Sequence, residues 1–326
     1  MMRAVRSERL THEGTMRSRP TKEDVLWMGA GAVILVALLL VVWHFRRDED
    51  PARLLASKAS RVDLVAGMEV ALSRAAEAEK SAVLAITDQD SKAFADQARA
   101  ATAEVDRKRQ ELGKLLDTGG TGRERDLLAQ FSRAFDDLRR IDDEVLALAV
   151  KNTNLKAYAL LFGPAAEALA ATGGALERVA ARAGGAEARQ VMLHAFGAEV
   201  AIQRVQILLS PHIAEESDAK MDQMEEAMRK DEDQVRRGLH ALAAVPALKG
   251  SGDLAAATSG FARYEEIKAR ILALSRENTN VRSLSLSLDR KRKATLVCAE
   301  ALSALEQAVL DEPIPGVTYG RPASPR

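Results

Sequence analysis

The feature that most constrains the fold is a stretch that occurs twice in the chain. Residues 135–162 and 261–288 align without a gap at a constant offset of 126 positions. The positions identical between the copies are, in first-copy numbers, Phe135, Ile141, Leu146, Ala147, Leu148, Asn152, Thr153, Asn154 and Leu160. A gapless match of this length indicates a duplicated unit. We therefore divide the main part of the sequence into two units, 51–185 and 186–311.

Apolar residues in the first copy recur at the helical spacing of three and four. They are Ile141, Val145, Leu148, Leu155, Ala159 and Phe162, and Asn152 lies on the same line. This spacing predicts a helix with one buried seam. Since neither copy has Gly or Pro at its Asn-Thr-Asn motif, we expect two uninterrupted helices, 123–182 with a kink at Pro164 and 253–310. Antiparallel packing of these helices would let each of them serve two four-helix bundles and would bring Asn152 close to Asn278.

The two Asn residues allow two interpretations. An Asn on a buried seam most often fixes the register of the packed helices. Alternatively, Asn152 and Asn278 line a pocket between helices, and Lys156 and Arg282, one helical turn away, receive an acidic group of a ligand. Asn152, Lys156, Asn278 and Arg282 are therefore the candidate ligand-binding residues.

Composition narrows the fold class and the partners. Only 4% of the residues are aromatic, and Ala, Leu, Arg and Glu dominate with helical periodicity, which is typical of long packed helices. We therefore expect an all-α antiparallel four-helix-bundle architecture in two duplicated units. The 47 Lys and Arg residues equal the 47 Asp and Glu residues, and no extended basic face occurs, so no nucleic-acid partner is predicted. Cys298 is the only cysteine, which excludes an internal disulfide and a cysteine metal site.

One transmembrane helix is predicted before the bundles. Residues 25–45 are an uninterrupted apolar run, about 31 Å long as a helix, and a bilayer core is about 30 Å thick. Trp27 and Trp43 lie near its ends, where aromatic rings prefer the headgroup boundary. A cleaved signal peptide is the alternative, but no small-x-small site follows the run. Residues 1–24 and 312–326 are expected to be disordered.

The sequence resembles the four-helix-bundle sensory (ligand-binding) domain of methyl-accepting chemotaxis proteins. The resemblance lies in the order of an anchor, the stretch FDDLRRIDDEVLALAVKNTNLKAYALLFG and its second copy. The resemblance covers most of residues 51–311, and the Asn-Thr-Asn stretch is its most specific part. It implies a ligand-sensing module on the extracytoplasmic side of the inner (cytoplasmic) membrane. It would also favour a turn at each Asn-Thr-Asn motif, in contrast to the uninterrupted helices expected above.

The sequence departs from such receptors after the bundles. No second hydrophobic span, HAMP linker or cytoplasmic signalling region follows. The resemblance therefore implies a module that passes its signal to another membrane receptor or signalling protein. By analogy with such sensory bundles, we also expect a parallel homodimer through residues 54–75.

Catalytic and cofactor sites are not predicted. A di-iron bundle needs Glu-x-x-His pairs, and no His here has a Glu three residues before it. Residues 119–122 lack the Gly-Lys-Ser/Thr of a phosphate loop. Asp142, Asp143 and Glu144 are interpreted as a solvated helix face, and residues 290–293 as a solvated basic cluster. We therefore expect that the protein is not an enzyme and has no cofactor or metal site.

The predicted function is therefore a membrane-anchored sensory bundle of the chemoreceptor type that binds a small ligand or a partner. The alternative is a structural or scaffolding bundle of the cell envelope, held by the same anchor.

Overall fold

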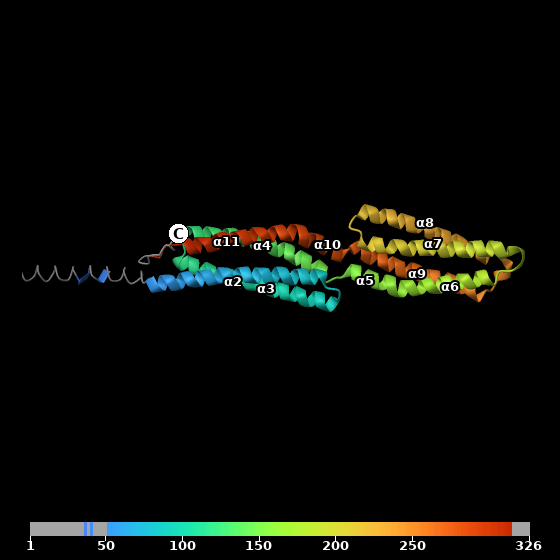
Figure 1. Cartoon of the computed structure of the whole chain (residues 1–326), viewed down its shortest axis with the longest axis horizontal. Helices are drawn as coiled ribbons and strands as arrows, with labels where there is room; N and C mark the ends of the chain where they lie inside the picture. Colours follow the sequence, from blue (N-terminus) through green and yellow to red (C-terminus); the bar gives the residue numbers. More distant parts are fainter. Residues whose placement is uncertain (1–35, 38–39, 42–50, 315–326) are drawn as a thin grey trace, which may run out of the picture. The chain divides into compact units, whose positions relative to one another are not determined.

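The computed structural model describes residues 36–37, 40–41 and 51–314. The predicted N-terminal segment, most of the predicted transmembrane helix and the tail from residue 315 lie outside the described residues. Residues from Ala59 to Glu312 form one compact unit, which is drawn with its helices labelled in Figure 1.

The described chain is a succession of helices joined by short connections. The elements are α2 (Pro51–Leu84), α3 (Asp88–Gly119), α4 (Gly122–Ala149), α5 (Thr153–Leu160), the π-helical turn η1 (Leu161–Ala165), α6 (Ala166–Ala181), the 3-10 turn η2 (Gly185–Glu187), α7 (Ala188–Ala214), α8 (Asp218–Ala243), the 3-10 turn η3 (Pro246–Leu248), α9 (Gly252–Glu277), α10 (Thr279–Leu286), the π-helical turn η4 (Ser287–Lys291) and α11 (Arg292–Asp311). No strand occurs between residues 51 and 314, so the all-α prediction is confirmed for that range.

Hydrogen-bonded caps explain where several helices begin. The Thr87 hydroxyl accepts from the Asp90 amide over 3.0 Å at the start of α3. At the start of α4, Thr121 and Glu124 form a reciprocal capping box, which satisfies two amides that the helix itself cannot bond. Residues 119–122 form the break between two helices, because α3 ends at Gly119 and α4 begins at Gly122.

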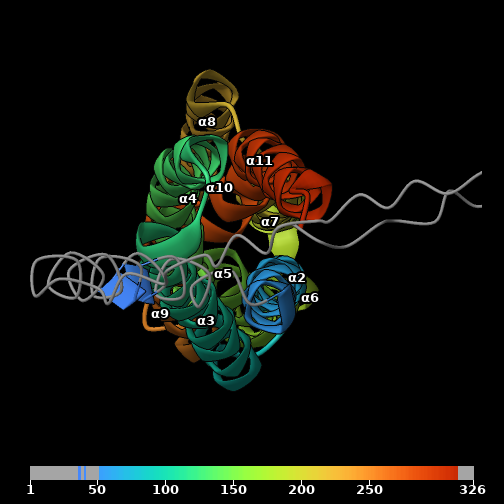
Figure 2. The same cartoon turned by 90° about the vertical axis from the view of Figure 1, so that its left-hand side faces the viewer.

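One hydrophobic core lies among α2, α3, α4 and α11, which Figure 2 shows end-on; we call this group the first bundle. Its largest cluster of buried residues comprises Val65, Met68, Ala71, Leu72, Val105, Leu112, Leu116, Phe131, Phe135, Leu138, Cys298, Leu302, Leu305 and Val309. These residues come from the beginning and the end of the described chain. The first bundle therefore closes only when α11 returns to pack on α4.

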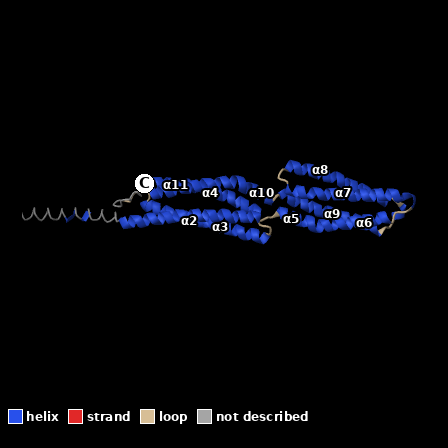
Figure 3. Ribbon diagram, viewed as in Figure 1, coloured by secondary structure: helices blue, strands red, loops and turns tan. Residues whose placement is uncertain are grey.

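A second core lies among α6, α7, α8 and α9, here called the second bundle. It includes one buried face of α7, which consists of Val191, Ala195, Ala198, Ile202, Val205 and Leu209. Figure 3 shows that both bundles consist of helices alone. Each core takes helices from both sequence units, because the segments α4–α6 and α9–α11 pass from one core to the other.

These two crossing segments are not the uninterrupted helices that the heptad pattern predicted. Each is broken at its Asn-Thr-Asn motif, where α4 gives way to α5 and α9 to α10. Each also contains a π-helical turn, at residues 161–165 and 287–291. Pro164 explains the first turn, but no proline occurs in the second. The expected antiparallel meeting of the two motifs is confirmed by the hydrogen bonds described below.

Among the described residues, one helical stretch is long and apolar enough to cross a membrane, residues 122–181. Leu146, Leu161 and Leu176 of this stretch are buried in the two cores. These three leucines therefore take part in core packing.

Candidate functional site

The two Asn-Thr-Asn motifs share an unusual backbone conformation. Asn152 has φ 52° and ψ 40°, and Asn278 has φ 51° and ψ 39°. These are the only described residues other than glycine with positive φ. Asn tolerates this left-handed conformation better than other residues, since its short polar side chain can bond nearby groups. The helix breaks therefore depend on the residue that the sequence places there twice.

Backbone amides and hydroxyls join the two motifs reciprocally. The Thr153 amide donates to the Thr279 hydroxyl over 3.2 Å, and the Thr279 amide donates to the Thr153 hydroxyl over 3.1 Å. One residue further on, the amides of Asn154 and Asn280 each donate to the other's side-chain carbonyl, over 3.2 and 3.1 Å. Amides at the start of a helix lack partners within it. Each motif therefore caps the helix that begins in the other.

The side-chain amides complete this junction. Asn154 Nδ2 donates to Asn278 Oδ1 over 2.7 Å, and Asn280 Nδ2 donates to Asn152 Oδ1 over 3.0 Å. Asn152, Asn154 and Asn278 are buried. Asn152 and Asn278 thus meet at one junction, as the sequence predicted, but each bonds the third residue of the opposite motif.

Two interhelical loops are held by the same side chains. Asn278 Nδ2 donates to the Glu215 carbonyl over 2.7 Å, and Asn154 Nδ2 donates to the Ile213 carbonyl over 2.6 Å, both near the α7–α8 loop. Asn152 Nδ2 donates to Asp88 Oδ1 over 3.0 Å, next to the α2–α3 loop. The junction therefore fixes one loop of each bundle.

Lys156 and Arg282, the two predicted cationic ligand contacts, lie at the edge of this junction. Lys156 Nζ is 3.2 Å from Asp88 Oδ2, and Arg282 lies 3.9 Å from Asp218 Oδ1. Their side chains are 47% and 48% exposed. The hydrogen bonds from Asn152 and Lys156 lower the pKa of Asp88. Both cations thus face solvent and already hold an acidic partner.

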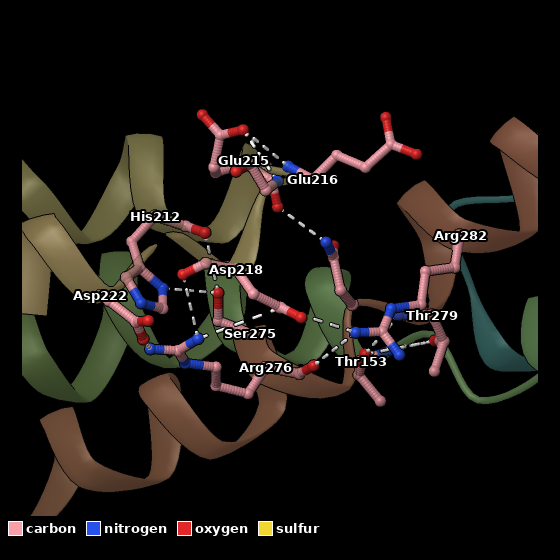
Figure 4. Close-up of polar contacts among 12 residues, drawn as sticks. Thr153, His212, Glu215, Glu216, Asp218, Asp222, Ser275, Arg276, Thr279 and Arg282 are labelled. Carbon is pink, nitrogen blue, oxygen red and sulfur yellow. Dashed lines mark hydrogen bonds and ion pairs between the residues drawn. The ribbon is translucent and has the colours of Figure 1, made fainter. Parts of the chain in front are cut away.

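A polar network that the sequence did not indicate locks α7 to α9 (Figure 4). His212 Nδ1 lies 2.8 Å from Ser275 Oγ. His212 Nε2 lies 3.1 Å from Glu225 Oε1. Arg276 Nε donates to the same Glu225 oxygen over 2.8 Å. Burial lowers the pKa of His212. Although Ser, His and Glu are the residue types of a hydrolase triad, Ser275 and His212 are fully buried and the serine hydroxyl bonds the His212 carbonyl. This arrangement is a packing contact.

The first bundle contains a buried group of three charged residues. Lys291 Nζ lies 2.7 Å from Glu79 Oε2 and 2.9 Å from Asp142 Oδ1, and all three residues are buried. Burial raises the pKa of Asp142, and the ammonium of Lys291 offsets this only in part. The interpretation of Asp142 and Lys291 as solvated charges was therefore wrong. The duplication could have indicated the burial of Lys291, because Lys291 is equivalent to Ala165 at the offset of 126 and Ala165 is buried.

A cleft of about 200 Å³ opens between α3 and α4 of the first bundle. Its lining includes Arg99, Asp106, Arg139, Asp142 and Asp143. Neither Asn-Thr-Asn motif lines this cleft. Within the part of the chain that the structure describes, no group of three or more His, Cys, Asp or Glu side chains could hold a metal ion.

These observations define the class as an all-α protein of packed four-helix bundles whose polar centre is a structural junction. Residues 69–182 match the family model of a four helix bundle sensory module for signal transduction, which confirms the resemblance seen in the sequence. No curated protein and no solved structure matches the chain. The matched residues run from α2 to α6 and include Asn152 and Lys156. The match is to a signal-transduction module and not to a catalytic family.

Proposed function

We propose that this protein is a sensor of the chemoreceptor type, anchored in the inner (cytoplasmic) membrane by residues 25–45, with its bundles on the extracytoplasmic side. The match of residues 69–182 to a sensory module carries the proposal. Within the matched residues, the segment α4–α6 extends from the first bundle through the junction into the second. A change at one bundle can therefore reach the other through the junction.

The proposed ligand is a small acid whose acidic group binds Lys156 and Arg282. Asn152 and Asn278 lie one helical turn before these two residues. Exposed ion pairs such as Lys156–Asp88 are weak, so a carboxylate from solution can compete with Asp88. Asp88 also accepts the hydrogen bond from Asn152. Displacement of Asp88 would break this hydrogen bond from Asn152 and so link ligand binding to the junction.

A thermal-shift screen of the full-length protein in detergent tests this proposal. Small organic acids and amino acids would be compared with amines, because a ligand that binds only the folded state raises the unfolding midpoint. We expect an acid to raise the midpoint of the wild type and of a Lys230→Ala control, but not of Lys156→Ala/Arg282→Ala. No response to any acid, or an equal response in the double variant, would refute the site.

A reporter enzyme that is active only outside the cytoplasm, fused after Arg326, tests the topology. Activity of the fusion in membranes supports the proposed orientation. Activity of a cytoplasmic reporter at the same position would contradict it.

We also propose that the two sequence units arose by duplication. Equivalent positions 126 residues apart adopt the same left-handed conformation and exchange reciprocal hydrogen bonds. Both segments also place a π-helical turn at equivalent residues.

A structural scaffold of the cell envelope is the second candidate function. It is favoured by the junction, whose buried side-chain amides bond one another and two loops and so need no ligand. A negative ligand screen together with co-purification of another envelope protein would favour this function over sensing.

A further inference from the structure

Helix α7 carries a second apolar seam in addition to the one buried in the second bundle. Leu193, Phe196, Val200 and Ile207 are 70%, 50%, 47% and 70% exposed. Their spacing of three, four and seven places them at the a and d positions of a heptad, with exposed Gln203 at the remaining d position. Single exposed apolar residues are ordinary, but a continuous a/d line on one helix is the pattern of a coiled-coil interface.

The turn η1 next to α7 carries another exposed aromatic residue. Gln206 Nε2 of α7 donates to the Leu161 carbonyl over 3.3 Å, which places η1 beside the C-terminal half of α7. Phe162 in that turn is 71% exposed, and its ring stacks on that of Tyr158. Exposed apolar residues gathered on α7 and on the turn beside it are typical of an interaction surface.

The charges that flank the seam indicate which partner fits it. Glu199 directly precedes the a residue Val200, and Arg204 directly follows the d residue Gln203, so they occupy a g position and the following e position. In a parallel pair of identical helices, g of one helix faces the next e of the other, which joins Glu199 to Arg204 twice. In an antiparallel pair, g faces g and e faces e, so Glu199 and Arg204 could not pair with each other across the interface.

The monomer leaves these two side chains available for such pairing. The side chain of Arg204 is 59% exposed, and its ion pair with Asp231 is long at 3.7 Å. Glu199 is half-buried at the edge of the seam, where burial and Glu177 raise its pKa. An arginine from a second copy would supply the cation that Glu199 lacks within this helix face.

We propose that α7 of one copy packs in parallel against α7 of a second copy, through Leu193, Phe196, Val200, Gln203 and Ile207. The interface spans two heptads, about 21 Å of helix. The inference rests on the proposed function in one respect, because anchors in one membrane hold both copies parallel and raise their effective concentration. This surface differs from residues 54–75, where the sequence led us to expect the dimer.

Disulfide crosslinking of the full-length protein in its own membranes tests the inference. Single cysteines would replace Leu193, Phe196, Val200, Gln203 and Ile207 in a Cys298→Ala background. Lys230 and Arg182, whose side chains are 75% and 70% exposed, supply matched control positions. The unaltered chain is a second control, because Cys298 is buried and burial raises its pKa to about 12.

We expect dimers at the five seam positions and none above background at the controls. An antiparallel pair would crosslink near Val200 but not at Leu193 or Ile207, and would overturn the proposed orientation. Crosslinks to a different protein at these positions, or none at all, would overturn the homodimer.

Charge reversal tests whether Glu199 of one copy pairs with Arg204 of the other. Glu199→Arg and Arg204→Glu should each reduce crosslinking at position 200 by roughly threefold to tenfold, and the double reversal should restore it. Equal crosslinking in all four proteins would contradict the pairing. These readouts need no ligand, so a failed ligand screen leaves them intact, and a failed crosslink leaves the proposed ligand site untouched.

Discussion

The guanidinium of Arg61 in α2 lies 2.7 Å from the carboxylate of Glu124 in α4, and both residues are buried. Glu124 also accepts the Thr121 amide in the capping box of α4. Arg61 contacts Glu312, just after α11, as a second acid. Arg61 therefore ties α2 to the start of α4 and to the residue after α11.

Removal of Glu124 should destabilise the protein strongly. Glu124→Ala leaves the buried Arg61 with one partner, and breaking a buried pair in this way costs about 3–5 kcal/mol. Urea unfolding of the two proteins measures the loss. Glu144→Ala removes an acid of the same helix that is exposed and lies 3.8 Å from Arg290, so it should change stability little. Equal losses of unfolding free energy in the two variants would show that the buried pair stabilises the protein no more than the exposed one.

The reciprocal Thr153–Thr279 bonds predict a non-additive pair of substitutions. Thr153→Ala removes the acceptor of the buried Thr279 amide, and an unsatisfied buried amide costs about 1–3 kcal/mol. Thr153→Ser keeps the hydroxyl and should cost less. In a double-mutant cycle with Thr279→Ala, the two losses should not add, since both residues belong to one network. Additive losses would mean that the two motifs do not act together.

The buried group of Glu79, Asp142 and Lys291 predicts a pH-dependent difference between variants. The pKa of folded Asp142 is raised, so its contribution to stability is present below its unfolded pKa of about 3.8 and is lost as pH rises through the folded pKa. The stability of Asp142→Asn relative to wild type should therefore improve as pH rises over that window. Unfolding curves of both proteins from acid to neutral pH check this; a relative stability that falls with pH would refute it.

The ammonium of Lys291 should be essential to the same group. Lys291→Met leaves two carboxylates buried without a cation, and the loss should be about 3–5 kcal/mol at neutral pH. The deficit relative to wild type should shrink in acid, because protonation removes the buried negative charge. A deficit that is independent of pH would indicate that only the packing of the Lys291 side chain matters. The exposed Lys293, paired with Asp289, offers Lys293→Met as the control.

The sequence predicted the helices, the exchange of long segments between bundles and the meeting of Asn152 with Asn278, because apolar spacing and loop signals report burial directly. It missed the helix breaks at these residues. A heptad pattern continues through a single left-handed residue without a visible gap, and only the positive φ of Asn reveals the break. It also missed the burial of Lys291 and Asp142, since a charge on the seam is recognisable only when its partner on another helix is known.

The close approach of α6 and α9 predicts an effect of adding one methyl group. A Cβ on Gly260 would lie 2.6 Å from the hydroxyl of Thr172, which is buried and donates to the Ala168 carbonyl. Since Thr172 has little room to move, Gly260→Ala should destabilise the protein by about 1–3 kcal/mol, although alanine favours a helix more than glycine does. Gly163 supplies the matched control, because nothing lies within 4 Å of its Cβ position and Gly163→Ala should be neutral or stabilising. Thermal unfolding of the two variants decides the matter: if Gly260→Ala is as stable as Gly163→Ala, the contact between α6 and α9 is looser than the structure shows.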